Sequence, residues 1–249
     1  MPDKRRHRGA APGDRRIFAG EFIDRMRSAV EDLSWLLSRG YAQKSAVKLV
    51  GDRFQLTSRQ RQAVMRGACS DESLAIRRSR RVGSEELRGR ALYLDGYNVL
   101  TSVEAALAGG ALFVGRDGCL RDVASMHGSF RKVEETEPAI RLMVETLESL
   151  GVERTIWYLD QPVSNSGRLK AAILGISEEK GVEAEVGLVP SPDRVLIDIV
   201  PNEVVACTAD RVVLDGCSAW FNLAEHVIGR RVEGAWVIEL RGGSGRSGS

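Results

Sequence analysis

The chain has 249 residues, of which 43% are hydrophobic and 28% are charged, and its formal net charge is +2. These totals are ordinary for a soluble globular protein with one α/β domain or two unequal ones. No apolar run reaches the roughly 18 to 20 residues of a membrane helix. The basic N-terminal stretch is followed by no apolar segment of the kind that a secretory signal needs. We therefore expect a cytoplasmic protein with no membrane partner.

The charge is divided unevenly along the chain. Residues 1–90 contain 21 lysines and arginines against 11 aspartates and glutamates, whereas residues 91–249 contain 15 against 23. A basic surface attracts nucleic acid, and clustered carboxylates hold cations, so this division suggests two functional regions. An uneven division that arose by chance or for solubility explains the numbers equally well.

The four cysteines are far apart in the sequence, at Cys69, Cys119, Cys207 and Cys217. They form no C-x-x-C pair, and no histidine lies close enough to complete a zinc pattern. The sequence therefore predicts buried, reduced thiols.

The N-terminal part is predicted to be basic and helical. Residues 1–15 lack periodicity and are interpreted as a disordered basic arm, and residues 16–88 as a small helical domain. Apolar residues recur at helical spacing over 18–38, and Gly40 is suited to end that helix. A second helix is expected to start at Thr57, because Thr57 and Gln60 fit a capping box.

Arginines are concentrated in the second half of this helical domain. They are Arg59, Arg61, Arg66, Arg77, Arg78, Arg80 and Arg81. Such residues bind the RNA backbone in many proteins, and that binding weakens steeply with salt. A solvated run of charge is the equally weighted alternative.

From residue 89 to residue 241 the sequence alternates between strand-like and helix-like segments. Strands are predicted over 91–100, 153–160, 182–190 and 203–210, and helices over 137–151, 166–181, 191–200 and 218–229. This alternation favours an α/β domain with a doubly wound, mostly parallel sheet. Residues 101–130 remain unassigned, and a loop that covers a ligand site is one possibility. Residues 242–249 are interpreted as a flexible tail.

Three of the predicted strands end in an aspartate, namely Asp95, Asp160 and Asp210. One such aspartate is uninformative, because aspartate is a favoured turn residue. In an open parallel sheet, however, ligands bind outside the carboxyl ends of the strands. Carboxylates that meet there repel one another unless a cation lies among them. Mg²⁺ or Mn²⁺ is predicted, since hard cations prefer carboxylate oxygens and water.

Two further aspartates are weaker candidates for the same site. Asp193 lies in the first turn of the predicted short helix, where the helix dipole alone favours an acid. Asp215 follows Asp210 by five residues and could instead cap the last helix or support the site indirectly. Asp122 and Asp198 carry less weight.

The segment after Asp160 resembles an anion-binding helix start. The candidate phosphate-binding residues are Ser164, Ser166, Arg168 and Lys170, with Thr208 from the CTAD segment. An ordinary capped helix accounts for the first four, and Thr208 could hold the aspartate or cap a turn rather than hold a phosphate.

Taken in order, the segments LYLDGYNVL, WYLD, SPDR and CTADRVVLD resemble the NYN branch of the PIN-like nucleases over about residues 90–228. The stretch from LLSRGY to QLTSRQRQAVMRGACSD is similar to the family of domain-of-unknown-function 434, a likeness that implies no activity.

The PIN-like resemblance implies a metal-dependent phosphodiesterase that acts on RNA. Asp95 would be the first metal ligand, Asn98 would orient it or contact the substrate, and the other strand-end aspartates with Asp193 would complete an acidic cluster. Many PIN domains also place a glutamate on the helix between the first two strands, and no motif marks one here. Two metals, one metal or a decayed site therefore all remain open.

Three rival interpretations remain beside the ribonuclease. A phosphatase-type hydrolase needs a second aspartate two residues after Asp95, where Tyr97 stands. A non-catalytic nucleic-acid-binding protein with a degenerate PIN-like half needs only the arginine helices, and a scaffold needs the aspartates only as turn and cap residues. The class of RNA, the choice between RNA and DNA, and the oligomeric state are not predicted.

Overall fold

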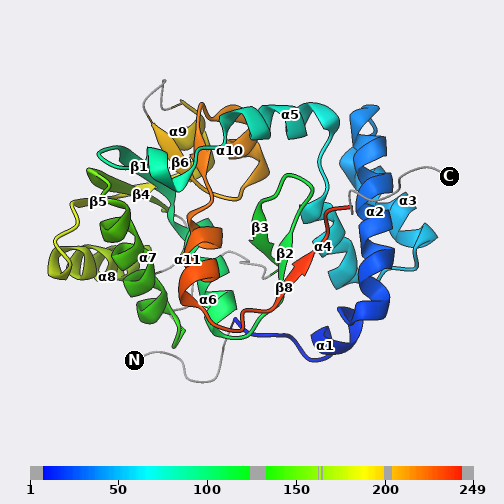
Figure 1. Ribbon diagram of the computed structural model, residues 1–249, viewed down its shortest axis with the longest axis horizontal. Helices are drawn as coiled ribbons and strands as arrows, with labels where there is room; N and C mark the ends of the chain where they lie inside the picture. The colour runs from blue at the N-terminus through cyan, green and yellow to red at the C-terminus, as the bar shows by residue number, and fades with distance from the viewer. Residues whose placement is uncertain (1–7, 124–132, 162, 164, 199–203, 243–249) are drawn as a thin grey trace.

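A five-stranded parallel sheet forms the centre of the C-terminal region (Figure 1). In a computed structural model, which describes residues 8–242 apart from 124–132, 162, 164 and 199–203, the strand order is β5-β4-β1-β6-β7. The strands are β1 (Ala91–Asp95), β4 (Arg154–Asp160), β5 (Ala184–Val189), β6 (Val205–Cys207) and β7 (Trp220–Phe221). Neighbouring strands pair in parallel, so their carboxyl ends lie at one edge.

Helices cover both faces of this sheet. On one face lie α6 (Gly96–Leu107), α7 (Thr136–Leu150), α8 (Ser166–Glu179) and α11 (Leu223–Arg231). On the other face lie α9 (Pro192–Asp198) and α10 (Arg211–Gly216). Successive side chains of β1 point to opposite faces of the sheet. Leu92 and Leu94 therefore lie in the hydrophobic core under α6, α7, α8 and α11, and Tyr93 packs against the core under α9 and α10. The predicted α/β class with a parallel sheet is confirmed.

A second, three-stranded sheet lies between this unit and the N-terminal helices (Figure 1). Its order is β3-β2-β8, with β2 antiparallel to β3 and parallel to β8. The strands are β2 (Leu112–Val114), β3 (Leu120–Asp122) and β8 (Val237–Glu239). The N-terminal elements are α1 (Asp14–Ile17), α2 (Gly20–Ser38), α3 (Gln43–Arg53), α4 (Ser58–Gly67), α5 (Asp71–Arg80) and the 3₁₀ turn η1 (Ser84–Glu86).

The N-terminal helices share one hydrophobic core with this small sheet. Phe18 and Leu33 pack in the same cluster as Phe113, Ile238 and Leu240, and the rings of Phe18 and Phe113 meet edge to face at 4.9 Å. The helices of the predicted N-terminal domain are therefore completed by strands from the C-terminal part of the chain.

Several local predictions are confirmed. Thr57 and Gln60 form the capping box that starts α4. Gly40 follows the end of α2 with a φ of +77°, and Gly151 follows α7 with a φ of +64°, a left-handed conformation that favours glycine. The four cysteines are buried free thiols, and burial raises the pKa of each. Among the described residues no helix is long and apolar enough to cross a membrane.

Four local predictions need correction. The helix predicted over 218–229 begins only at Leu223, because Trp220 and Phe221 pair with β6 as strand β7. The strand predicted over 91–100 ends at Asp95, because Asp95 caps a helix that begins at Gly96. The unassigned stretch 101–130 contains the end of α6 and the β2–β3 hairpin, while residues 124–132 lie outside the described residues. The N-terminal arm is ordered from residue 8 onward, because Asp14 is buried and holds Arg59. Residues 1–7 and 243–249 also lie outside the described residues.

Candidate functional site

A cavity of about 430 Å³ opens at the carboxyl edge of the parallel sheet. Five aspartates line it, and we call four of them the aspartate cluster: Asp95, Asp160, Asp193 and Asp210. The topology explains their meeting, because β1 lies between β4 and β6 and the residues that follow these strands reach the same edge. Asp193 arrives from α9, which follows β5. This is the place where open α/β sheets bind ligands.

Asp95 is held by contacts from two neighbouring strand ends. One carboxylate oxygen, Oδ1, accepts a long 3.4 Å hydrogen bond from the backbone N–H of Asn98 and so caps α6. The other, Oδ2, accepts a 3.0 Å hydrogen bond from the Thr208 hydroxyl. That hydroxyl oxygen in turn accepts from the backbone N–H of Asp210 at 3.0 Å. Thr208 therefore binds the aspartate, one of the alternatives that the sequence left open.

Asn98 fastens the start of α6 to the loop after β6. Its side-chain Oδ1 accepts a 2.8 Å hydrogen bond from the backbone N–H of Ala209. Asp210 itself caps α10 and accepts from the backbone N–H groups of Val212 and Val213 at 2.7 and 3.3 Å. The cavity wall is thus tied together by backbone and side-chain hydrogen bonds, which fix the aspartates with respect to one another.

The aspartate cluster carries negative charge that no neighbouring cation balances. No lysine, arginine or histidine of the described residues forms an ion pair with these four side chains. Burial raises the pKa of Asp95 to about 7, and Asp193 and Asp210 add to the shift while Thr208 opposes it. Burial also raises the pKa of Asp193, helped by Asp210 and Asp160, and the pKa of Asp160. Such shifts in a cleft are typical of functional sites.

The donor atoms of the cavity suit a hard divalent cation. They are carboxylate oxygens with the amide of Asn98, which is the set that Mg²⁺ and Mn²⁺ prefer. Within the part of the chain that the structure describes, no three His, Cys, Asp or Glu side chains are placed to hold one ion together. An ion bound by fewer than three of these side chains would keep several water ligands, as Mg²⁺ usually does.

Three arginines reach the same cavity from three different elements. Arg121 on β3 uses its donors within the protein. Its guanidinium donates to Asp117 at 2.6 and 2.9 Å and to the carbonyl of Ala209 at 2.8 Å. Arg66 on α4 donates to the backbone carbonyl of Asp122 at 2.5 Å. Arg211 on α10 donates to the side chain of Gln43 at 3.0 Å. The cavity therefore has an acidic and a basic part.

Residues 84–226 match the domain of unknown function DUF5616, and residues 25–80 match the protein of unknown function DUF434. The chain belongs to the DUF5616 family. The similarity to domain-of-unknown-function 434 that the sequence indicated is confirmed. The chain is also 30% identical over 189 residues to the uncharacterized protein MJ0935 of Methanocaldococcus jannaschii, a match that covers 76% of this chain and 88% of that protein. No solved structure matches the chain.

The cavity of this DUF5616 protein combines side chains from both matched regions. Arg66 and Met65 come from the stretch that matches DUF434, whereas the aspartate cluster comes from the stretch that matches DUF5616. The N-terminal helices therefore contribute to the site itself as well as to the fold.

Sequence reasoning missed part of the cavity wall. Arg121, Arg211 and Ser102 were not predicted, and Asp122 was given little weight, yet all four line the cavity. Ser102 donates to the Asp122 carboxylate at 2.8 Å. Arg211 directly follows Asp210, which is the one signal that could have revealed it. Arg121 and Asp122 had no local signal, because β3 is three residues long and lies in the unassigned stretch. Ser102 lies on α6, in a part of the same stretch that was not predicted to be helical.

Several predicted site residues lie elsewhere. Asp215 is not at the cavity, because its carboxylate accepts from the Arg77 guanidinium at 2.7 and 2.9 Å. Ser166 is buried and hydrogen-bonds the Tyr97 hydroxyl at 2.7 Å, so it supports the structure rather than an anion. Arg168 and Lys170 are not among the residues that line the cavity. Ser164 lies outside the described residues.

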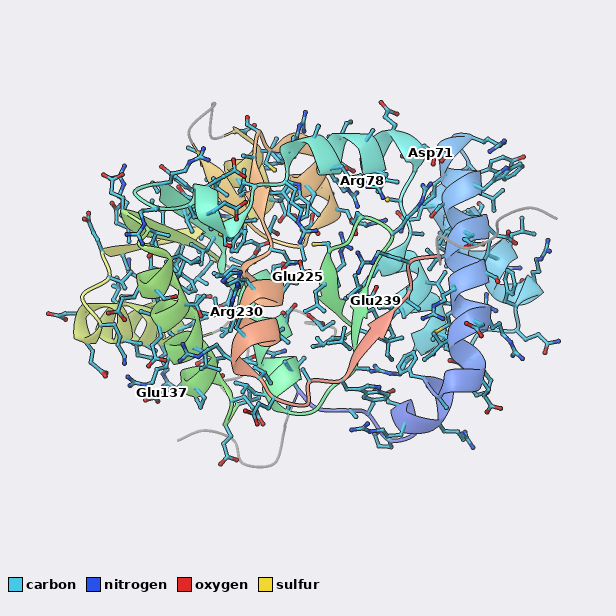
Figure 2. All side chains as sticks on the ribbon, in the orientation of Figure 1. Asp71, Arg78, Glu137, Glu225, Arg230 and Glu239 are labelled. Carbon is cyan, nitrogen blue, oxygen red and sulfur yellow. The ribbon has the colours of Figure 1, made fainter. Side chains whose placement is uncertain are left out.

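The predicted arginine face is largely used inside the protein. Arg77 is 2% exposed and is ion-paired with Asp117 and Asp215. The other pairs are Arg59 with Asp14, Arg61 with Asp52, Arg80 with the carbonyl of Asp215, and Arg81 with Glu225. Arg78, labelled on α5 in Figure 2, is exposed. Of the seven arginines, Arg66 alone lines the cavity.

Proposed function

We propose that this DUF5616 protein is a ribonuclease of the PIN-like type that hydrolyses phosphodiester bonds with Mg²⁺ or Mn²⁺. The observation that carries the proposal is the aspartate cluster, four uncompensated carboxylates in one cavity at the carboxyl edge of a parallel sheet. Buried carboxylates of this kind lower the stability of the protein when they are all ionised. A bound cation offsets that cost, which is a physical reason to expect one here.

The residues of the chain have distinct parts in this proposal. Asp160 and Asp193 accept no side-chain hydrogen bond that would compete with a cation, so they are the candidates to hold it. Asp95 and Asp210 are oriented by Thr208 and by the start of α10. When bound, the ion would polarise a phosphoryl oxygen and lower the pKa of a water. RNA as the substrate rests on the resemblance to PIN-like nucleases.

Two rivals are separated by particular observations. The phosphatase-type mechanism lacks its second acid, because Tyr97 stands at that place and is buried against Ser166. The non-catalytic RNA-binding protein is the second candidate, and the lack of three converging metal ligands among the described residues favours it. Cleavage in the presence of metal distinguishes it from the ribonuclease.

The first experiment is a cleavage assay on labelled structured and single-stranded RNAs, with single-stranded DNA alongside, in Mg²⁺, Mn²⁺ or EDTA. We expect metal-dependent cuts that fall at least about a hundredfold in Asp193→Asn, since that carboxylate is in the site and makes no described hydrogen bond to the fold. The matched control is Asp24→Asn, which removes the same charge from the exposed face of α2. Binding of RNA without cleavage in any metal would contradict the proposal and leave the second candidate.

A further inference from the structure

Arg211 differs from the other two arginines at the cavity in having no carboxylate partner. Arg121 pairs with Asp117, and Arg66 lies 3.3 Å from the carboxylate of Asp122. Among the described residues no Asp or Glu lies within 4.0 Å of the Arg211 guanidinium, whose one described acceptor is Gln43. Its remaining N–H groups have no acceptor in the described structure.

The surroundings of Arg211 leave its positive charge in excess. The side chain is half-buried in the cavity wall, close to two other arginines. The charges of Arg77 and Arg121 act on Arg211 unfavourably, whereas Asp210 and Asp215 act on it favourably without forming an ion pair with it. A buried cation without a counterion is costly unless an anion comes to it.

Gln43 holds this cation in a fixed position. It is the first residue of α3, in the N-terminal helices, and its Oε1 accepts from Nη2 of Arg211 at 3.0 Å. A neutral amide oxygen orients the guanidinium without cancelling its charge, which a glutamate at the same place would do. The planar guanidinium thus keeps donors in the fork arrangement that matches a phosphate group.

We propose that Arg211 binds a phosphate group of the RNA backbone at the cavity, and that Gln43 is the residue that positions it. This inference rests on the proposed function for the kind of anion, since the aspartate cluster in the same cavity holds the cation that a phosphodiester needs beside it. The N-terminal helices then take part in substrate binding through an amide that presents an arginine, rather than through a broad basic face.

The test is the binding of a fluorescein-labelled 12-nucleotide single-stranded RNA to the full chain, followed by anisotropy in EDTA and in Ca²⁺, with the RNA checked for integrity on a gel. Arg211→Gln is expected to weaken binding about tenfold and to lower the slope of log affinity against log salt by about 1. Arg211→Lys, which keeps the charge without the fork, is expected to recover part of the affinity. Arg25→Gln is the matched control, with the same loss of charge at an exposed site on α2.

Gln43→Glu separates positioning from a merely structural role. The new carboxylate would pair with Arg211 and suits the first turn of α3, so the protein should stay as stable in urea while RNA binding falls about tenfold. If Gln43 were only structural, Gln43→Glu would bind RNA as the wild type does.

Two outcomes would overturn the inference. One is wild-type affinity in both Arg211→Gln and Gln43→Glu, and the other is an equal loss in Arg211→Gln and Arg25→Gln, which would mean diffuse attraction. Failure of the proposed function looks different, because RNA would then remain uncut in every metal while the effect of Arg211→Gln on binding persisted. Urea unfolding of each variant, with Arg211→Lys as the milder change, excludes loss of the fold as the cause.

Discussion

Two groups of buried charges lie close together in this protein and are built in opposite ways. In the arginine–aspartate cluster, Asp117 lies between Arg77 and Arg121 at 2.6 to 2.9 Å. Burial alone would raise the pKa of Asp117, but the two arginines hold that pKa well below its usual range. In the aspartate cluster no described cation is paired, and burial raises the pKa of Asp95 to about 7.

The arginine–aspartate cluster stabilises the fold, whereas the aspartate cluster is available for a ligand. The arginine–aspartate cluster is complete without any other molecule, and it joins α5, the β2–β3 hairpin and, through Asp215, α10. The aspartate cluster has no ion-paired cation among the described residues, and we propose that it binds a metal ion. Asp95 is buried as deeply as Asp117, so the presence or absence of a counterion is what distinguishes these two carboxylates.

The largest effect is expected from Asp117→Asn, which breaks the arginine–aspartate cluster. Two buried arginines would lose their shared carboxylate, and the free energy of unfolding should fall by about 3 to 5 kcal/mol. Urea denaturation measures this loss. The control is Asp52→Asn, which removes an exposed partner of Arg61 and Lys48 and should lower the free energy of unfolding far less. Equal losses in the two variants would contradict the comparison.

The second prediction concerns the stability of the metal-free protein as a function of pH. The folded pKa of Asp95 is about 7 against a usual 3.8, so the folded state binds the proton more tightly than the unfolded chain does. Stability contributed by Asp95 is therefore present below about pH 4 and is lost as the pH rises to about 7.

Asp95→Asn removes this titration. Relative to the variant, the wild type in EDTA should lose on the order of 3 kcal/mol of unfolding free energy between pH 4 and pH 8. Glu104 is buried as well, with its pKa raised by burial to about 7, but it is present in both proteins and cancels in the difference. A difference that does not change with pH would show that folding does not raise the pKa of Asp95.

The third prediction concerns the binding of Mn²⁺ to the aspartate cluster. Mn²⁺ at about a hundred times its dissociation constant should raise the free energy of unfolding by about 2.7 kcal/mol. The gain should be larger at pH 8 than at pH 6, because the cation competes with the proton on Asp95. Thermal melts with and without Mn²⁺ measure it. Asp193→Asn should lose most of the gain and Asp24→Asn should keep it, whereas equal gains in both would place the ion elsewhere.

The smallest effect is expected from Thr208→Val, which removes the hydroxyl that donates a hydrogen bond to Asp95. The variant loses the bond to Asp95 and the one accepted from the Asp210 N–H, at a cost of about 1 to 2 kcal/mol. The pH titration of stability should also move upward, because Thr208 opposes the rise in the pKa of Asp95. Thr101→Val is the control, since that hydroxyl donates to the Asn98 carbonyl within the same helix. If the midpoint of the pH dependence of stability were the same in Thr208→Val as in the wild type, the role given to Thr208 would be contradicted.

The parts of the site that follow from local rules could be predicted from the sequence. An apolar run that ends in aspartate places Asp95 and Asp160 at the ends of β1 and β4, and a parallel sheet brings such ends to one edge. The capping box at Thr57 is equally local, because both partners lie within four residues.

The remaining parts depend on partners that are distant in the sequence. Asp215 follows Asp210 closely, yet it faces Arg77, which the sequence places 138 positions away. The arginine run showed a surplus of charge but not which carboxylates would meet it. The short strands β2 and β8 have no pattern of their own, because their pairing partners decide that they are strands.

The parallel pairing of β2 with β8 has a consequence for how the protein is made. The N-terminal helices leave the ribosome first, but Phe18 and Leu33 can be buried only when Ile238 and Leu240, near the other end of the printed sequence, have also been synthesised. Domains that fold as units during translation bury their apolar faces early. Here the apolar faces of the N-terminal helices stay partly uncovered until the last strand has been made, and contacts between such distant residues slow folding. A nascent chain of this protein therefore offers the apolar sides of its first helices to chaperones for most of its synthesis.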